Sequence, residues 1–352
     1  MLNNTSKRTL ALTVASLAVA LLMVPVLAST IELTETGSTL LYPLMTAWVD
    51  AYESSHPDVR IVTAATGSGI GIAQAASGAA TFGASDAAVP DPRTSGVDSI
   101  PLAISAQHIG YHISGIDPGT NVRLSAPLLA AIYSGAITHW NDPRIAALNA
   151  DLAAKLPATT IVPIRREDAS GDTFLFTEYL RVAGGGAWSA GSGTRVNWPS
   201  VPGEQLAKQN RDVVQLLAAI NGSIGYVGIS YLEQTKNAGV GIVALRNRSG
   251  AFVVPDDAAI AATVATERSD GPGAPSLIDR PGAKSYPIVN VEYAIVRTHG
   301  YDAQTASALR GFLGWTIDPA GGNARPLLAP VHFVALPDRL RARSRAQIAE
   351  IQ

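Results

Sequence analysis

The chain has 352 residues, a formal net charge of −2 and no cysteine, and 47% of its residues are hydrophobic while only 15% are charged. It is long and apolar enough for two domains with their own cores, and it does not have the composition of a disordered chain. The small net charge argues against nucleic acid as a partner, because proteins that bind nucleic acid normally carry a clear basic excess.

Residues 1–28 have the pattern of an export signal. Lys7 and Arg8 precede an uncharged apolar run over residues 10–24, and Val26-Leu27-Ala28 fits cleavage after Ala28. The run is short for a membrane-spanning helix, so we expect a cleaved signal. The mature protein is then expected in the periplasm or at the extracellular face of the cell membrane, stabilised by its core and not by disulfides.

Two units at the start of the mature chain each lead from a strand through a glycine turn into a helix. In the first, Gly37-Ser38-Thr39 is followed by apolar residues at helical spacing from Leu40 to Tyr52. Thr39 is therefore expected at a helix N-terminus, where its hydroxyl either caps the helix or binds a ligand.

The second unit places Thr66-Gly67-Ser68-Gly69 between the strand-like residues 59–63 and a helix. It is neither a Walker loop nor a dinucleotide fingerprint. Glycines of this kind bring backbone N–H groups close to an anion, although they also suit a simple tight turn.

Asp86 follows a small-residue strand at residues 80–85 and has apolar residues on both sides. An unpaired carboxylate is costly to bury, so Asp86 is expected to cap a turn or to have a specific partner.

The most informative stretch is PIRREDASGDTFLF, residues 163–176. A strand ends in arginines and turns through Ser170-Gly171-Asp172 into a helix. Arg166 offers a planar fork of donors, and the turn offers a hydroxyl and free N–H groups at the positive end of a helix. Asp168 is placed to hold the Arg166 guanidinium. A solvated surface ion pair is the alternative.

Further along, strands are expected at residues 100–104, 109–113, 223–229 and 288–297, with helices at 125–134, 205–220, 305–316 and 338–351. Strands that alternate with helices predict a mainly parallel α/β protein, in which ligands bind at the carboxyl ends of strands. His108 and His112 lack a third ligand nearby, and no Cys or HExxH motif is present, so we expect no metal and no cofactor.

Six segments occur in an order and spacing that resembles the phosphate-binding protein of bacterial phosphate ABC importers. They are GSTLLYP, TGSGIGIAQ, FGASDAAV, RREDASGDTFLF, NGSIGYVGISYLE and YPIVNVEYAIV. The resemblance runs from about Leu33 to Leu336. It implies a type II periplasmic-binding-protein fold, in which two α/β lobes are joined by two crossing strands and the ligand lies in the inter-lobe cleft.

The lobes implied are residues 30–106 plus 285–352, and residues 107–284, with hinges near His108–His112 and Tyr286–Asn290. The implied phosphate site includes Thr39, the backbone of Leu40, Ser68, Asp86, Arg166, Ser170, the backbone of Gly171, and Asp172, with Asp168 orienting Arg166. The partners implied are inorganic phosphate and the membrane permease of the importer, and we expect a monomer without enzymatic activity.

Two positions depart from the family pattern: Leu40 stands where phenylalanine is frequent, and Asp172 stands where the family has a threonine.

Asp86 would accept the proton that phosphate carries at neutral pH and sulfate does not. A receptor for sulfate or molybdate is therefore disfavoured, whereas a receptor for arsenate stays open. A secreted phosphatase would need a nucleophile or metal ions that the motif does not supply. A sensor or adhesin that uses the fold as a scaffold is the remaining alternative.

Overall fold

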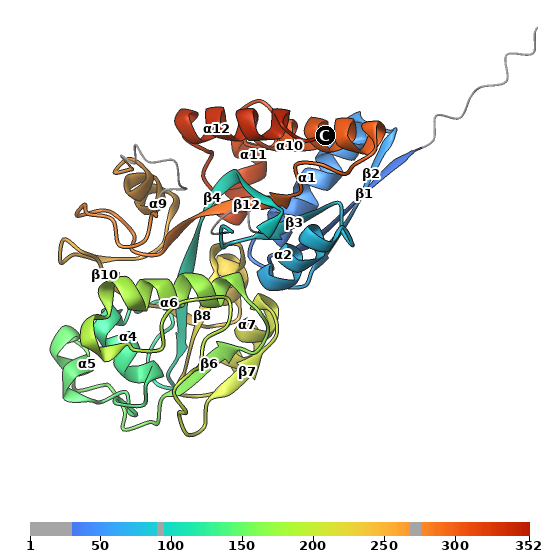
Figure 1. The fold of residues 1–352 in the computed structure, drawn as a ribbon. Helices are drawn as coiled ribbons and strands as arrows, with labels where there is room; N and C mark the ends of the chain where they lie inside the picture. The colour runs from blue at the N-terminus through green and yellow to red at the C-terminus, as the bar shows by residue number, and fades with distance from the viewer. Residues whose placement is uncertain (1–29, 90–94, 268–275) are drawn as a thin grey trace, which may run out of the picture.

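The computed structural model describes residues 30–89, 95–267 and 276–352, and it is an α/β protein. Figure 1 shows helices packed on both sides of a twisted sheet that runs through the whole molecule. The expected export signal, residues 1–28, lies outside the described residues, as does most of the Gly- and Pro-rich stretch at 269–281. Within the described ranges, no helix combines the length and the apolar character needed to cross a bilayer.

The main sheet has the order β2-β1-β3-β12-β4-β8-β6-β7, with β9 paired to β4. Its strands are β1 (Ile31–Gly37), β2 (Val59–Ala65), β3 (Phe82–Ser85), β4 (Asp98–His112), β6 (Val162–Arg166), β7 (Gln205–Ala207), β8 (Ser223–Gly228), β9 (Gly241–Ile242) and β12 (Val289–Val296). A smaller sheet contains β5 (Arg123–Leu124), β10 (Ala244–Arg246) and β11 (Phe252–Val253).

The sheet is mixed and not mainly parallel as expected. Strands β1, β2 and β3 are parallel to one another, and β6 is parallel to both β7 and β8, but β4 and β12 pair antiparallel with their neighbours. Within each parallel group, the strands have their carboxyl ends at the same edge of the sheet. Loops that lead into helices start at this edge, where ligands bind in α/β proteins.

Strand β4 joins the two parallel groups. It pairs with β12 over Asp98–Ala106 and with β8 over Gln107–His112. The two strands expected at residues 100–104 and 109–113 are therefore one strand of 15 residues. Nearly all of it is buried, as expected for a central strand covered on both faces.

Helices cover both groups of strands. On the side of β1 and β2 lie α1 (Tyr42–Ser55), α2 (Ser68–Ser77), α10 (Ala303–Thr316), α11 (Arg325–Leu328), the 3-10 turn η3 (Ala329–Val331) and α12 (Asp338–Ala349). Around β6 and β8 lie α4 (Ala126–Tyr133), α5 (Pro143–Leu148), α6 (Gly171–Ala183) and α7 (Asn210–Ala219). The 3-10 turn η1 (Gly185–Ala187) follows α6, and the 3-10 turn η2 (Ile229–Tyr231) and α8 (Leu232–Asn237) follow β8. Helix α9 (Asp257–Val264) precedes β12.

The apolar periodicity of the sequence accounts for most of these helices. In α1, for example, Leu44, Met45, Trp48, Val49 and Tyr52 are buried, and they recur at the three- and four-residue spacing that gives one helix face. The expected helix at 205–220 is shorter, because Gln205–Ala207 pairs with β6 as strand β7 and the helix begins only at Asn210.

Candidate anion-binding site

Arg166 is the last residue of β6, and its side chain is completely buried. Its Nε and Nη2 donate to the two carboxylate oxygens of Asp168 at 2.8 and 2.7 Å, and Nε also donates to the carbonyl of Lys208 at 3.0 Å. Its backbone N–H donates to the Tyr226 hydroxyl at 2.9 Å. The side chain is thus fixed by a planar two-point contact, and its burial excludes the alternative of a solvated surface pair for Arg166.

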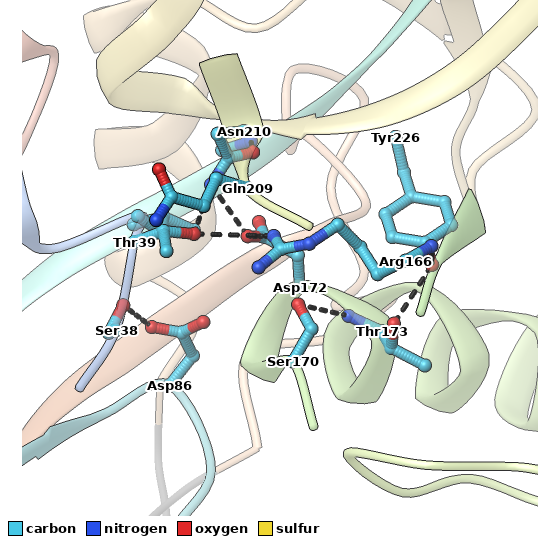
Figure 2. A network of polar contacts seen from close by, with 12 residues as sticks. Ser38, Thr39, Asp86, Arg166, Ser170, Asp172, Thr173, Gln209, Asn210 and Tyr226 are labelled. Carbon is cyan, nitrogen blue, oxygen red and sulfur yellow. Dashed lines mark hydrogen bonds and ion pairs between the residues drawn. The ribbon is translucent and has the colours of Figure 1, made fainter. Parts of the chain in front are cut away.

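The third guanidinium nitrogen of Arg166, Nη1, contacts Thr39 and Asp172. Nη1 donates to the Thr39 hydroxyl at 3.2 Å and to Oδ2 of Asp172 at 2.9 Å, as Figure 2 shows. Asn210, the first residue of α7, donates from Nδ2 to the same two oxygens at 2.9 and 2.7 Å. Thr39, Arg166 and Asp172 therefore share one buried network, although Thr39 lies 127 residues from Arg166 in the sequence.

The hydroxyl that serves the start of α1 is that of Ser38 and not that of Thr39. Ser38 Oγ accepts a hydrogen bond from the Leu41 N–H at 3.0 Å, and the helix begins at Tyr42. The helix start expected at Thr39 is therefore three residues too early, and the Thr39 hydroxyl is free of a capping role. Ser38 also donates to Asp86 Oδ1.

Asp86 follows β3 directly and is buried. Its backbone N–H donates to the hydroxyl of Ser68, the first residue of α2, at 3.1 Å. A Cβ atom placed on Gly171 would overlap both Asp86 Oδ2 and Ser68 Oγ, so only glycine fits at Gly171 in this arrangement. The glycine turn before α2 also contacts the other strand group, since the Gly69 N–H donates to the Ala169 carbonyl at 2.9 Å.

Ser170 and Gly171 begin α6, whose first turn faces Asp86 in Figure 2. The Ser170 side chain accepts a long hydrogen bond of 3.4 Å from the Thr173 N–H, which leaves its hydroxyl hydrogen available. Leu40, which follows Thr39 in the chain, is buried, and its carbonyl accepts a hydrogen bond from the Ser230 hydroxyl at 2.7 Å.

Carboxylates outnumber the cation in this network. Burial disfavours the charge of Arg166, but the carboxylates of Asp172 and Asp168 outweigh burial and raise its pKa. Burial, and to a smaller extent the charge of Asp86, raise the pKa of Asp172, whereas Arg166 lowers it, and the net pKa is about 6. Burial likewise raises the pKa of Asp86 against the hydrogen bonds it accepts. The site therefore holds more carboxyl groups than its one guanidinium can neutralise. Such a site favours an anion that brings a proton.

All the site residues expected from the sequence lie in or beside this network: Thr39, Leu40, Ser68, Asp86, Arg166, Asp168, Ser170, Gly171 and Asp172. Sequence reasoning missed Ser38, Gln107, Asn210 and Glu292. Gln107, on β4, donates from Nε2 to the carbonyl of Asp172 at 2.9 Å and to its Oδ1 at 3.1 Å. No metal cluster of three or more His, Cys, Asp or Glu side chains is found in the part of the chain that the structure describes.

This fold and this site define the class of the protein. Residues 25–320 match the family model of the PBP superfamily domain. Among solved structures, a high-affinity periplasmic phosphate-binding protein (PfluDING) bound with phosphate shares the fold at a TM-score of 0.71 with 19% identity, over 90% of this chain and 93% of the other. The phosphate-binding protein of Stenotrophomonas maltophilia gives 0.67 with 20% identity, over the same shares of the two chains.

Curated relatives narrow the class. The chain is 31% identical over 332 residues to the phosphate-binding protein PstS of Methanocaldococcus jannaschii, covering 88% of this chain and 84% of that one. It is 32% identical over 317 residues to PstS of Xylella fastidiosa, covering 88% and 83%. The chain belongs to the PstS family of phosphate-binding proteins, and the resemblance drawn from the six sequence segments is confirmed.

Proposed function

We propose that this protein is an extracytoplasmic receptor that binds inorganic phosphate, without chemical conversion, and delivers it to the permease of an ABC importer. The observation that carries the proposal is the convergence of Thr39, Asp86 and Arg166 on one buried site at the ends of three strands. Membership of the PstS family supports phosphate as the ligand.

The proposed phosphate site contains Thr39, the backbone of Leu40, Ser68, Asp86, Arg166, Ser170, the backbone of Gly171, and Asp172. Two kinds of group supply the recognition. The fixed guanidinium and the start of α6 provide donors for the anionic oxygens. The buried carboxylates provide acceptors that only a protonated anion can satisfy.

The chain forms two lobes of the type II binding-protein fold in this proposal, residues 30–106 plus 285–352 and residues 107–284. Strands β4 and β12 connect them, and phosphate lies in the cleft between them. Contacts from one proposed lobe to the other support a closed form: Gln209 Nε2 donates to the Ala65 carbonyl at 2.9 Å, and Asn210 donates to Thr39 at 2.9 Å. Opening would break these contacts by hinge motion near His108–His112 and Tyr286–Asn290.

Selection against sulfate follows from the acceptors. Hydrogen phosphate and sulfate have the same shape and charge, but only phosphate carries a proton at neutral pH. The carboxylate of Asp86 accepts that proton, whereas sulfate would leave two acceptors facing each other without a hydrogen. Arsenate carries the same proton as phosphate, so this site does not discriminate against it by that route.

The protein is proposed to work as a monomer after export, in the periplasm or at the outer face of the membrane. Its family consists of binding proteins, which supports a receptor and not a secreted phosphatase. Arg166 and Asp172 would be the groups drawn into a phosphatase mechanism, but they are paired with each other at 2.9 Å, so neither is free as a base or nucleophile.

Calorimetric titration of the ligand-stripped mature protein tests the proposal. We expect tight one-to-one binding of phosphate and no heat from sulfate at neutral pH, with phosphate affinity rising in mildly acidic buffer because Asp172 then takes up a proton. Sulfate bound as tightly as phosphate would point to another oxyanion receptor. Release of phosphate from a phosphomonoester would point to the phosphatase, and no oxyanion binding at either pH would leave a scaffold role.

A further inference from the structure

Beside Asp86 lies a second buried carboxyl group, which belongs to the last of the six sequence segments but was not among the expected site residues. Glu292 is in β12, and its side chain is completely buried. Its Oε1 accepts hydrogen bonds from the hydroxyl of Ser105 and from Nδ2 of Asn290, the latter at 3.0 Å. Its Oε2 receives no hydrogen bond from any donor among the described residues. The antiparallel pairing of Tyr293 with Ser85 brings Glu292 next to Asp86, and the charges of the two carboxyl groups act on each other.

Two neighbouring buried carboxyl groups avoid ionising together, and they can form a hydrogen bond with each other only when one of them carries a proton. Glu292 forms no ion pair with a cation within the ranges that the structure describes, and two adjacent buried carboxylates would repel each other. Burial and the neighbouring charge of Asp86 raise the pKa of Glu292 well above its usual range.

The surroundings place the proton on Glu292. Asp86 accepts a hydrogen bond from Ser38 and lies in the field of Arg166, and both favour its ionised form. The other charged group that faces Asp86 is Asp172, and Tyr293 is the titratable group beside Glu292. None of these supplies a positive charge to Glu292, whereas its unpaired Oε2 is free to carry hydrogen.

We infer that Glu292 is a positioning residue of the anion site, which stays neutral and donates its proton in a hydrogen bond that keeps Asp86 an ionised acceptor. Asn290 fixes the pair, because its Nδ2 donates to the Asp86 carbonyl at 2.7 Å and also to Glu292. The inference rests on the proposed phosphate-binding function, and it deepens that function by naming what sets the proton balance of Asp86.

Two substitutions separate the donor role of Glu292 from its charge. Glu292→Gln keeps an N–H donor towards Asp86 and an oxygen towards Ser105, so the phosphate affinity and the phosphate-to-sulfate ratio should stay within about threefold of the wild type. Glu292→Leu removes the donor, Asp86 then binds a proton itself, and the ratio should fall by about tenfold or more. Glu35→Gln is the matched control, since Glu35 is another buried carboxyl with a raised pKa but is hydrogen-bonded to Thr63.

The infrared spectrum of the stripped protein reports the proton directly. Near neutral pH, the wild type should show the carbonyl stretch of a protonated Glu292. This band should be absent from Glu292→Gln. It should remain in Glu35→Gln, which can lose only a band of Glu35 itself. This comparison decides the matter alone if Glu292→Leu does not fold.

Two results would overturn the inference. One is a wild-type spectrum without a band assignable to Glu292. The other is a rise in phosphate affinity of about tenfold or more in Glu292→Gln, which would mean that the substitution removed a negative charge. A wild-type protein that shows the band but binds no phosphate would instead refute the proposed function, while the shared proton would stand.

Discussion

Asp172 offers a stability prediction because two opposing effects act on its carboxyl group. Its side chain is 1% exposed, which disfavours ionisation, whereas Arg166 Nη1 at 2.9 Å and Asn210 Nδ2 at 2.7 Å favour it. Burial prevails and raises the pKa from 3.8 to about 6. The partners Arg166, Asn210 and Gln107 all come from the same proposed lobe, so they remain with Asp172 whether the cleft is open or closed.

The sign follows from proton binding. Since the folded-state pKa exceeds the unfolded one, the folded protein binds more protons between about pH 4 and 6, and the ionisation of Asp172 costs stability as the pH rises through that window. A shift of about two units corresponds to roughly 3 kcal/mol when the carboxylate is fully ionised. Asp172→Asn removes this cost. Gln107 accommodates the new amide, because its Oε1 has no partner and turns to accept from it.

The assay is denaturant unfolding of the ligand-stripped wild type and Asp172→Asn across this pH range. The variant-minus-wild-type difference in the free energy of unfolding should become about 2 kcal/mol more positive between about pH 4.5 and 7.5. Ser223→Ala removes a buried hydroxyl that does not titrate, so its difference from the wild type should not change with pH. A flat or opposite trend for Asp172→Asn would refute the reasoning, because it would mean that pairing with Arg166 balances or outweighs burial.

Two further substitutions test recognition in the same site. Asp86→Asn replaces an acceptor by a group that also donates, so the gap between phosphate and sulfate affinity should narrow by about tenfold or more in a calorimetric titration, and an unchanged ratio would remove Asp86 from that role. Arg166→Lys keeps the charge but loses the two-point contact with Asp168 and the contact with Thr39. Phosphate affinity should fall about a hundredfold or more, and a loss below about threefold would show that the charge alone suffices.

The sequence predicted the part of the site that is local in the chain. Arg166 and Asp168 are two residues apart at the end of a strand, so their contact follows from geometry over a short distance. Ser170 and Gly171 were placed at a helix start by the same reasoning, and α6 indeed begins at Gly171 with Ser170 as its N-cap. The start of α1 was placed too early because the apolar spacing already begins at Leu40, whereas the helix begins at Tyr42 and Ser38 supplies the hydroxyl.

The residues that were missed reach the site from far along the chain. Gln107 lies 65 positions from Asp172 and Asn210 lies 38 from it, and no short motif marks either residue. The polar residues Ser105, Gln107 and His108 interrupt the apolar pattern of β4, which is why one strand was expected as two. Their side chains are buried and hydrogen-bonded, so these polar residues continue the strand and do not break it. Glu292 carried a similar signal as a lone acid within an apolar strand.

The central claim is that phosphate binds where the start of α6 meets Asp86, and Gly171 tests it most directly. A Cβ atom on Gly171 would overlap Asp86 Oδ2 and Ser68 Oγ, whereas a Cβ on Gly186, in the turn after the same helix, meets nothing within 4 Å. Equilibrium dialysis of the stripped proteins against radiolabelled phosphate should therefore show a loss of about a hundredfold or more for Gly171→Ala and wild-type affinity for Gly186→Ala. Wild-type affinity in Gly171→Ala would contradict the account, because phosphate would then bind elsewhere.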